Sequence, residues 1–392
     1  MSVTRPKGFV AAAGSAAIKG SGESDVTIVA TDDARPVSAA GVFTKNKAAA
    51  PPVEISRRHL EETGGYAAGV ILTSGNANAA TGESGRFAAS RLCGLVGDEL
   101  GVSKSEVLIC QTGLIGVRFP IETAERHVAA ITRTRTLGEE ADVAAATAIM
   151  TTDTVVKTAS AEGDGFIVGS IAKGAAMLAP DMATMLALVT TDANCSPQRS
   201  GAVLKEAVAG SFNEMTVDGC TSTNDTVILL ASGKAERRDE VGEDELFDAV
   251  SAVCHSLALQ MANDAEGATK VLNVTVTGAS SNEEALIAAR KVASSLLVKC
   301  SANGEDPYWG RVLSELGSAG VDFKIDRVSI SYGGVAVCRG GEGVEHDRSK
   351  VGAHMAGRVI EIACDVGIGN GEGVVVGTDL GYGYIDENRT TS

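Results

Sequence analysis

Short apolar runs alternate with helix-length segments along the first third of the chain, and this alternation limits the possible folds most. Residues 67–73 and 106–110 are apolar runs of strand length. Residues 83–100 and 120–132 carry the 3.6-residue periodicity of amphipathic helices, and Gly101 is a stop signal after the first of them. Strands that alternate with helices are typical of α/β proteins, so we expect sheets covered by helices.

The rest of the chain continues this pattern and changes character near residue 270. We expect helices at 140–149, 197–212, 243–264 and 282–297, and strands at 166–171, 182–189, 226–230, 271–277, 328–337, 359–366 and 374–385. The change suggests one domain over residues 1–275 and another over residues 276–392. The Gly-rich segment 367–373 precedes a strand rather than a helix, which predicts a hairpin turn and not a phosphate cradle.

Composition excludes several classes of protein. The 392 residues carry a formal charge of −16, which argues against nucleic acid or an anionic membrane as a partner. No apolar run approaches the roughly 18 residues of a membrane span. The eight cysteines are scattered without a C-x-x-C pair, which favours a reducing compartment such as the cytoplasm. The five histidines lack metal-ligand spacing, so no metal site is expected.

The segment K-G-A-A-M-L-A-P-D-M-A-T-M-L, residues 173–186, carries a polar turn directly into an apolar strand. On residue type alone, Thr184 is an ordinary β-former in that strand. It is preceded by the small Ala183, and Lys173 lies eleven positions upstream. A Thr hydroxyl becomes a nucleophile when a base lies beside it, and the α-amino group of an N-terminal Thr, with a pKa of about 7.7–8.0, is such a base.

Seven further blocks follow one another in a distinctive order: FTKN (43–46), SGNAN (74–78), TGLIG (112–116), IMTTD (149–153), STNDT (222–226), DAEG (264–267) and DPYWGR (306–311). Together with segment 173–186 they resemble the ornithine acetyltransferase family, the glutamate N-acetyltransferases of arginine biosynthesis, from about residue 8 to the end. The chain departs from the family pattern at Ala176, usually Gly, and at Tyr308, usually Asn. Its tail, 388–392, is one residue shorter.

The resemblance implies a fold and an assembly. The fold is a layered αββα sandwich of the self-cleaving ornithine acetyltransferase and aminopeptidase type, with a smaller C-terminal α/β subdomain. In this family the chain is cut between Ala and Thr, which here gives an α chain of residues 1–183 and a β chain that begins at Thr184. The expected assembly is an α2β2 heterotetramer, without a cofactor.

The resemblance also implies site residues. Thr184 is the nucleophile, which takes an acetyl group from N-acetylornithine and passes it to glutamate by a ping-pong mechanism. Thr112 and Gly113 form the oxyanion hole. The substrate contacts are Thr151, Lys173, Thr184, Glu266, Asn388 and Ser392. For the motif residues Asn224, Asp225 and Arg311, a structural role in a turn or cap is at least as well supported.

Two other functions remain open on the sequence. An N-terminal-nucleophile aminopeptidase or amidase would use the same Thr184 chemistry but pass the acyl group to water. A non-enzymatic acidic binding protein would keep Thr184 as a strand residue. Acetyl-CoA as a second acetyl donor, with an amino-acid N-acetyltransferase activity, also remains open.

Overall fold

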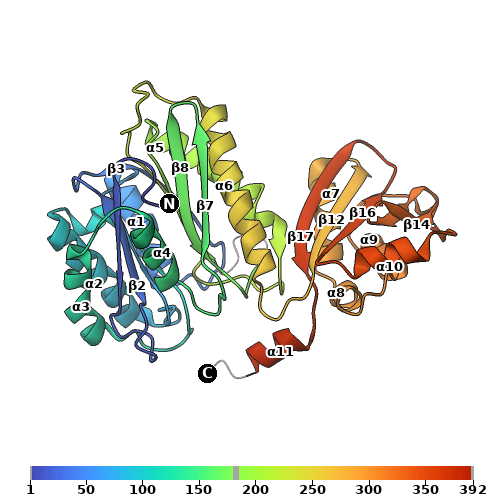
Figure 1. Ribbon diagram of the computed structural model, residues 1–392, viewed down its shortest axis with the longest axis horizontal. Coiled ribbons are helices and arrows are strands. Elements are labelled where there is room, and N and C mark those ends of the chain that lie inside the picture. The colour runs from blue at the N-terminus through green and yellow to red at the C-terminus, as the bar shows by residue number, and fades with distance from the viewer. Residues whose placement is uncertain (1, 180–184, 390–392) are drawn as a thin grey trace. The chain divides into compact units, whose positions relative to one another are not determined.

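The computed structural model describes residues 2–179 and 185–389, which form two compact units (Figure 1). The first unit comprises residues 2–175, 185–213 and 221–261, and the second comprises residues 176–179, 214–220 and 262–389. The domain boundary expected near residue 275 lies within β12 (Val271–Ala279), a strand of the second unit.

The described residues of the first unit form two sheets. The four-stranded sheet has the order β1-β2-β5-β6, with β1 (Phe9–Gly14), β2 (Val26–Thr31), β5 (Gly69–Thr73) and β6 (Val107–Gln111). The six-stranded sheet has the order β4-β3-β11-β9-β8-β7, with β4 (Tyr66–Ala67), β3 (Val37–Phe43), β11 (Thr226–Ala231), β9 (Leu186–Thr191), β8 (Phe166–Lys173) and β7 (Lys157–Gly163). Strand β9 runs parallel to β11 and antiparallel to β8.

The two sheets pack face to face because successive strand residues point to opposite faces. Leu72 and Leu108 of the first sheet share one buried cluster with Leu188 and Ile228 of the second. The opposite face of the first sheet packs against α2 (Gly82–Leu100) and α3 (Ile121–Arg133). On this face, Ile71 lies in one buried cluster with Leu92 and Val96 of α2 and Val128 of α3.

Helices also cover the outer face of the second sheet. Helix α5 (Pro197–Ala209) contacts β3, where the hydroxyls of Ser200 and Ser38 are 2.9 Å apart. Helix α6 (Glu243–Asn263) lies along β7, where Gln260 exchanges two hydrogen bonds with the backbone of Thr158 (Figure 1). The remaining helices of the unit are α1 (Pro51–Thr63) and α4 (Glu139–Ala148). The layered αββα sandwich is therefore confirmed.

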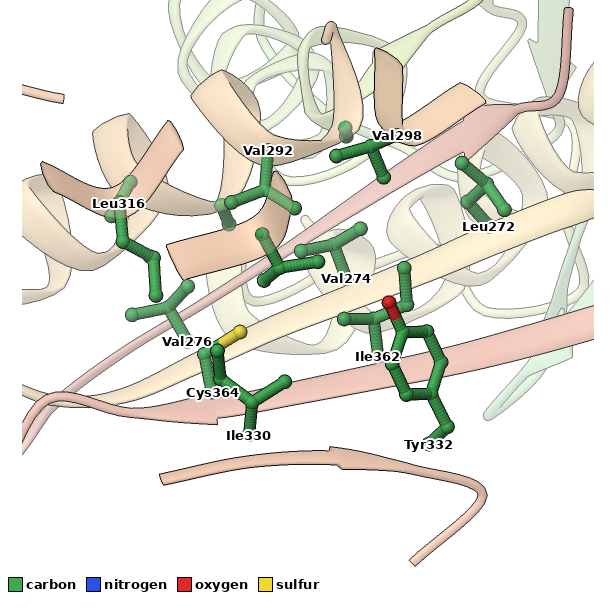
Figure 2. Packing of buried hydrophobic residues seen from close by; sticks show 14 of the residues in the cluster. Leu272, Val274, Val276, Val292, Val298, Leu316, Ile330, Tyr332, Ile362 and Cys364 are labelled. Carbon is green, nitrogen blue, oxygen red and sulfur yellow. The ribbon is translucent and has the colours of Figure 1, made fainter. Parts of the chain in front are cut away.

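The second unit is a smaller α/β unit around a seven-stranded sheet of order β10-β17-β12-β16-β13-β14-β15. Its strands are β10 (Met215–Thr216), β12, β13 (Ser329–Tyr332), β14 (Val335–Arg339), β15 (Glu342–Gly343), β16 (Val359–Asp365) and β17 (Gly371–Thr378). Its helices are α7 (Asn282–Ala293), α8 (Leu296–Asn303), α9 (Trp309–Gly317), α10 (Arg348–Met355) and α11 (Tyr382–Asn388). Figure 2 shows its core, in which Val274 and Val276 of β12 pack with Val292 of α7 and Leu316 of α9.

Three sequence-based expectations for the second unit were wrong. The helix expected at 282–297 is two helices, because Ser295 caps α8 by accepting a hydrogen bond from Val298 N at 3.3 Å. The strand expected at 374–385 ends at Thr378 and is followed by α11. Segment 367–373 is no hairpin turn, since β12 lies between β16 and β17. The segment crosses the end of β12 instead, where Ile368 N donates to Gly278 O at 2.6 Å.

Helices of membrane-spanning length and apolarity are absent from the described parts of the chain.

Candidate functional site

Strand β6 is fixed at the edge of its sheet by side chains of α1. Ser56 Oγ donates to Ile109 O at 2.7 Å and accepts from Ile109 N at 2.8 Å. His59 Nδ1 lies 2.8 Å from Val107 O. An edge strand has unpaired backbone groups, and these contacts satisfy several of them. The residues that follow β6 therefore begin from a rigid support.

Thr112 and Gly113 form the turn at the end of β6. Thr112 is buried, and its N–H donates to Thr73 O at 2.9 Å. Gly113 has a φ of +129°, and a Cβ at this position would lie 2.2 Å from the carbonyl carbon of Gly75. The turn thus requires glycine. It places a hydroxyl and a backbone N–H on consecutive residues, and these are the donors that an oxyanion hole uses.

A buried carboxylate, Asp153, organises two of the predicted substrate-binding residues. Asp153 Oδ1 accepts hydrogen bonds from Lys157 Nζ and from Gly174 N, both at 2.7 Å. Asp153 Oδ2 accepts from the backbone N–H of Thr151 at 3.1 Å and lies 3.8 Å from Lys173 Nζ. The structure therefore brings Thr151 and Lys173 together, although they are on different segments. We name Asp153, Lys157 and Lys173 the lysine cluster.

Within the lysine cluster, the two lysines keep Asp153 in its charged form. Burial opposes ionisation of Asp153, but Lys173, Lys157 and the hydrogen bonds outweigh it and lower the pKa of Asp153 to about 2. Near neutral pH Asp153 is therefore a carboxylate between two lysine side chains. The sequence reasoning missed Asp153 and Lys157. The signal available was an acidic residue two positions after Thr151 in the IMTTD block.

Strand β9 connects the lysine cluster to the cleavage segment. Leu186, at the start of β9, is paired with Lys173 on β8 and with Thr226 on β11. The preceding residue, Met185, donates its N–H to Asp225 Oδ1 at 3.0 Å, and its carbonyl accepts from Thr226 N at 3.2 Å. Ala183 and Thr184, the predicted cleavage site and nucleophile, lie outside the described residues.

The loop before β11 joins the two sheets at this end. Asn224 is buried, and its Nδ2 donates to Ala77 O at 2.6 Å and to Gln111 O at 2.9 Å. Gln111 precedes Thr112, and Asn224 precedes Asp225. A continuous chain of contacts therefore runs from the Thr112–Gly113 turn to Met185, the residue bonded to Thr184.

In the second unit, two further predicted site residues contact each other. Asn388 Nδ2, on α11, donates to Glu266 Oε2 at 2.7 Å and to Tyr384 O at 2.9 Å. Gly267 has a φ of +62°, and a Cβ there would lie 2.1 Å from Tyr384 N. Helix α11 thus packs directly on the backbone beside Glu266. Ser392 lies outside the described residues.

The segment that leads to the cleavage site is held by Asp218 of the same unit. Met177 N donates to Asp218 Oδ2 at 2.6 Å, and the Tyr384 hydroxyl donates to the same oxygen at 3.2 Å. Met177 has a φ of +53°, which is uncommon for a residue with a side chain. Burial raises the pKa of Asp218, although hydrogen bonds from the backbone N–H groups of Cys220 and Met177 act to lower it.

Arg311 has a structural place in the second unit. Its Nη1 donates to Leu297 O at 2.9 Å and to Ser301 Oγ at 2.6 Å, so it ties α9 to α8. Across residues 2–179 and 185–389, no group of three or more His, Cys, Asp or Glu side chains could hold a metal ion.

A family model and curated relatives match this chain over nearly its full length. A family model described as the ArgJ family matches residues 10–390. The arginine biosynthesis bifunctional protein ArgJ of Thermobifida fusca is 41% identical over 396 residues, covering 100% of both chains. The protein of the same name from Streptomyces coelicolor is 42% identical over 392 residues, again covering 100% of both.

Two solved structures are also similar. The arginine biosynthesis bifunctional protein of Bacillus halodurans is 34% identical, with a TM-score of 0.50, and the match covers 51% of this chain and 97% of that one. An ornithine acetyltransferase from Mycobacterium tuberculosis, solved with ornithine, is 36% identical, with a TM-score of 0.41 over 46% of this chain and 94% of that one. The family match and the full-length relatives together establish that this chain belongs to the ArgJ family.

Proposed function

We propose that this member of the ArgJ family is a self-cleaving glutamate N-acetyltransferase, an acyltransferase of arginine biosynthesis. It moves an acetyl group from N-acetylornithine to glutamate through an ester on Thr184. The observation that carries the proposal is the chain of contacts from the Thr112–Gly113 turn through Asn224 and Asp225 to Met185. It gives the nucleophile predicted at Thr184 a fixed neighbour and joins it to two predicted oxyanion donors.

Cleavage comes first in this mechanism. Thr184 Oγ attacks the carbonyl carbon of Ala183, and the peptide C–N bond breaks as the nitrogen becomes the α-amino group of Thr184. Water then hydrolyses the ester and leaves chains 1–183 and 184–392. The solved chain from Bacillus halodurans supports this step: it is matched over 97% of its length yet covers 51% of this chain, as expected of one product.

Acetyl transfer then uses the new N-terminus. The α-amino group takes the proton of Thr184 Oγ as the oxygen attacks the acetyl carbonyl of N-acetylornithine. The Thr112 hydroxyl and the Gly113 N–H stabilise the developing oxyanion. Ornithine leaves with the proton, and the amino group of glutamate attacks the acetyl ester. Because the first product leaves before the second substrate reacts, the kinetics are ping-pong.

The remaining predicted residues bind substrate. Lys173 binds an α-carboxylate, because a buried ammonium group favours an anion beside it. Thr151 contributes a hydrogen bond, Glu266 binds the ornithine ammonium, and Asn388 and Ser392 are the tail contacts. The ester carries the acetyl group, so the exchange needs no cofactor.

Three further features belong to the proposal. Acetyl-CoA is a second donor that would load the same ester, which accords with the word bifunctional in the names of the relatives. The cleaved chains assemble as an α2β2 heterotetramer. The enzyme works in the cytoplasm, where all eight cysteines, six of them buried, would stay in the free form that the structure has.

Intact mass and a transfer assay test the proposal together. The wild-type chain should separate under denaturing conditions into residues 1–183 and 184–392, and Thr184→Ala should remain one chain of 39.9 kDa without transfer activity. An active, uncleaved wild-type chain would contradict the mechanism. Release of acetate at the same rate with and without glutamate would instead favour the amidase.

A further inference from the structure

Asp379 is a buried acid of the second unit that the mechanism above leaves without a task. It lies directly after β17 and two positions before Gly381, the residue at which α11 begins. Asp379 is only 4% exposed. A carboxyl group in such a place is stable only when hydrogen bonds replace the water that it has lost. The groups that supply those hydrogen bonds therefore show what Asp379 holds in place.

Both carboxyl oxygens of Asp379 accept hydrogen bonds from segments far away in the sequence. Oδ1 accepts the backbone N–H groups of Thr269 and Lys270, at 2.8 and 2.9 Å. Oδ2 accepts the Thr269 hydroxyl at 2.5 Å and Nδ2 of Asn303, the last residue of α8, at 2.7 Å. In the reverse direction, Asp379 N donates to Lys270 O at 3.2 Å. One side chain thus joins the entry to α11, the end of α8 and the loop that follows Glu266.

The loop that Asp379 holds is short and packs on α11. Two residues separate Glu266 from Thr269, and the first of them is Gly267. A Cβ on Gly383, in the first turn of α11, would lie 2.9 Å from the Cα of Gly267. The backbone beside Glu266 therefore lies against α11 and is anchored at Thr269, so it has little freedom to move on its own.

The far end of α11 returns to the same loop. Asn388 Nδ2 donates to Glu266 Oε2 at 2.7 Å. The contacts close a ring, which runs from Asp379 through Thr269 to Glu266, across to Asn388 and back along α11. A carboxylate that recognises an ammonium group must be held within a fraction of an ångström, because a shift of about 1 Å at a binding group costs much of its effect. This ring provides such support for Glu266.

We propose that Asp379 is a positioning residue that sets specificity for the acetyl donor: it fixes the backbone beside Glu266, so that the Glu266 carboxylate meets the terminal ammonium of N-acetylornithine. This inference rests on the proposed function, in which Glu266 binds that ammonium. Asp379 itself does not touch the substrate. N-acetylnorvaline has the carbon chain of N-acetylornithine without the ammonium group. The ratio of kcat/KM for the two donors therefore measures recognition of the ammonium.

Asp379→Asn tests the proposal in the full-length protein. The variant keeps one oxygen for the two backbone N–H groups but turns the other into a donor, which faces the donating amide of Asn303. The preference for N-acetylornithine over N-acetylnorvaline should fall by about tenfold, because Glu266 is no longer held. A loss of folded enzyme would lower both kcat/KM values equally and leave their ratio unchanged. Combining Asp379→Asn with Asn303→Asp exchanges donor and acceptor, so most of the preference should return.

Asp347→Asn is the matched control. Asp347 also accepts two consecutive backbone N–H groups of the second unit, those of Ser349 and Lys350, both at 3.1 Å, but at the start of α10. Its donor preference should equal that of wild type.

Three outcomes would count against the inference. An unchanged preference in Asp379→Asn, or no recovery in the double variant, would overturn it and leave the proposed acetyl transfer intact. Equal kcat/KM values for the two donors in wild type would overturn the role of Glu266 as well. If Asp379→Asn does not fold, Asn303→Ala decides, since it removes one contact of Asp379 and should lower the preference by about threefold.

Discussion

Asn224 Nδ2 donates a hydrogen bond to the backbone oxygen of Gln111 over 2.9 Å, across the two sheets of the first unit. Gln111 is the last residue of β6, and Asn224 lies in the loop that leads into β11. The contact therefore fixes the Thr112–Gly113 turn relative to the start of β9, although 113 residues separate the two partners. The proposed oxyanion donors owe their position to this amide.

Asn224→Ala tests that role. It leaves the carbonyls of Ala77 and Gln111 without their donor in a buried place, so we expect a loss of about 2–3 kcal/mol in the free energy of unfolding. Acetyl transfer should fall by about tenfold or more, because Thr112 is no longer held. Urea unfolding and the transfer assay measure the two effects. Asn194→Ala, which removes a single exposed contact with Arg238 O, should change neither by much.

Gly113→Ala should be more damaging than its size suggests. The added Cβ would meet the Gly75 carbonyl carbon at 2.2 Å, so the turn must move and take the proposed oxyanion N–H with it. Loss of one such donor lowers kcat by about 10²–10³-fold. Gly116→Ala is the matched control, since Gly116 also has a positive φ (+80°) but open space around its Cα. Equal kcat values in the two variants would contradict the assignment.

Asp153→Asn should change the acid stability of the chain. The folded-state pKa of Asp153, about 2, is below its ordinary value of 3.8, so the stability that its charge contributes is present above pH 4 and is lost as pH falls toward 2. That contribution is about 2 kcal/mol. At pH 7 the variant should be less stable by about 3–5 kcal/mol, because it removes the Asp153 carboxylate from two buried ion pairs, with Lys157 and with Lys173. Urea unfolding between pH 7 and 2.5 measures the difference in free energy of unfolding between wild type and Asp153→Asn. This difference should become smaller toward pH 2.5. A difference that does not change with pH would contradict the stabilising role of the Asp153 carboxylate.

Asn388→Ala should affect transfer and spare cleavage. Asn388 is exposed, so its loss should change stability by less than about 0.5 kcal/mol. It holds Glu266, the residue proposed to bind the ornithine ammonium, so the KM for N-acetylornithine should rise by about tenfold. Steady-state kinetics and intact mass measure the two effects. Glu387→Gln, on the same helix, is the control, and a normal KM in Asn388→Ala would remove the tail contact from the proposal.

The sequence predicted the layers of the fold because their signals are local. Apolar runs predicted β5 and β6, and Gly101 ends α2 in the left-handed conformation that its position suggested, with a φ of +72°. The break between α7 and α8 also had a local signal, the capping Ser295, which the apolar periodicity obscured. The crossing of segment 367–373 over β12 had none, since strand order is a property of the whole sheet.

The lysine cluster shows why part of the site escaped prediction. Asp153 was visible as a motif residue, but its partners Lys157 and Lys173 come from two strands, β7 and β8, whose pairing sets which side chains meet. Asn224 and Asp225 were visible too, as residues of either a turn or a site. The contact of Asn224 with Gln111 depends on two sheets packing together, and that of Asp225 with Met185 depends on the pairing of β9 with β11; no local pattern encodes either.

The order of the six-stranded sheet has a consequence for a chain cut after Ala183. Strands β9 and β11 would belong to the second product, and they lie between β3 and β8, which would belong to the first. The two products would therefore share one sheet, in which β11 is hydrogen-bonded to β3 and β9 is hydrogen-bonded to β8 of the other product. They could be severed covalently without coming apart, and one could be recovered free of its partner only by unfolding the sheet that they share.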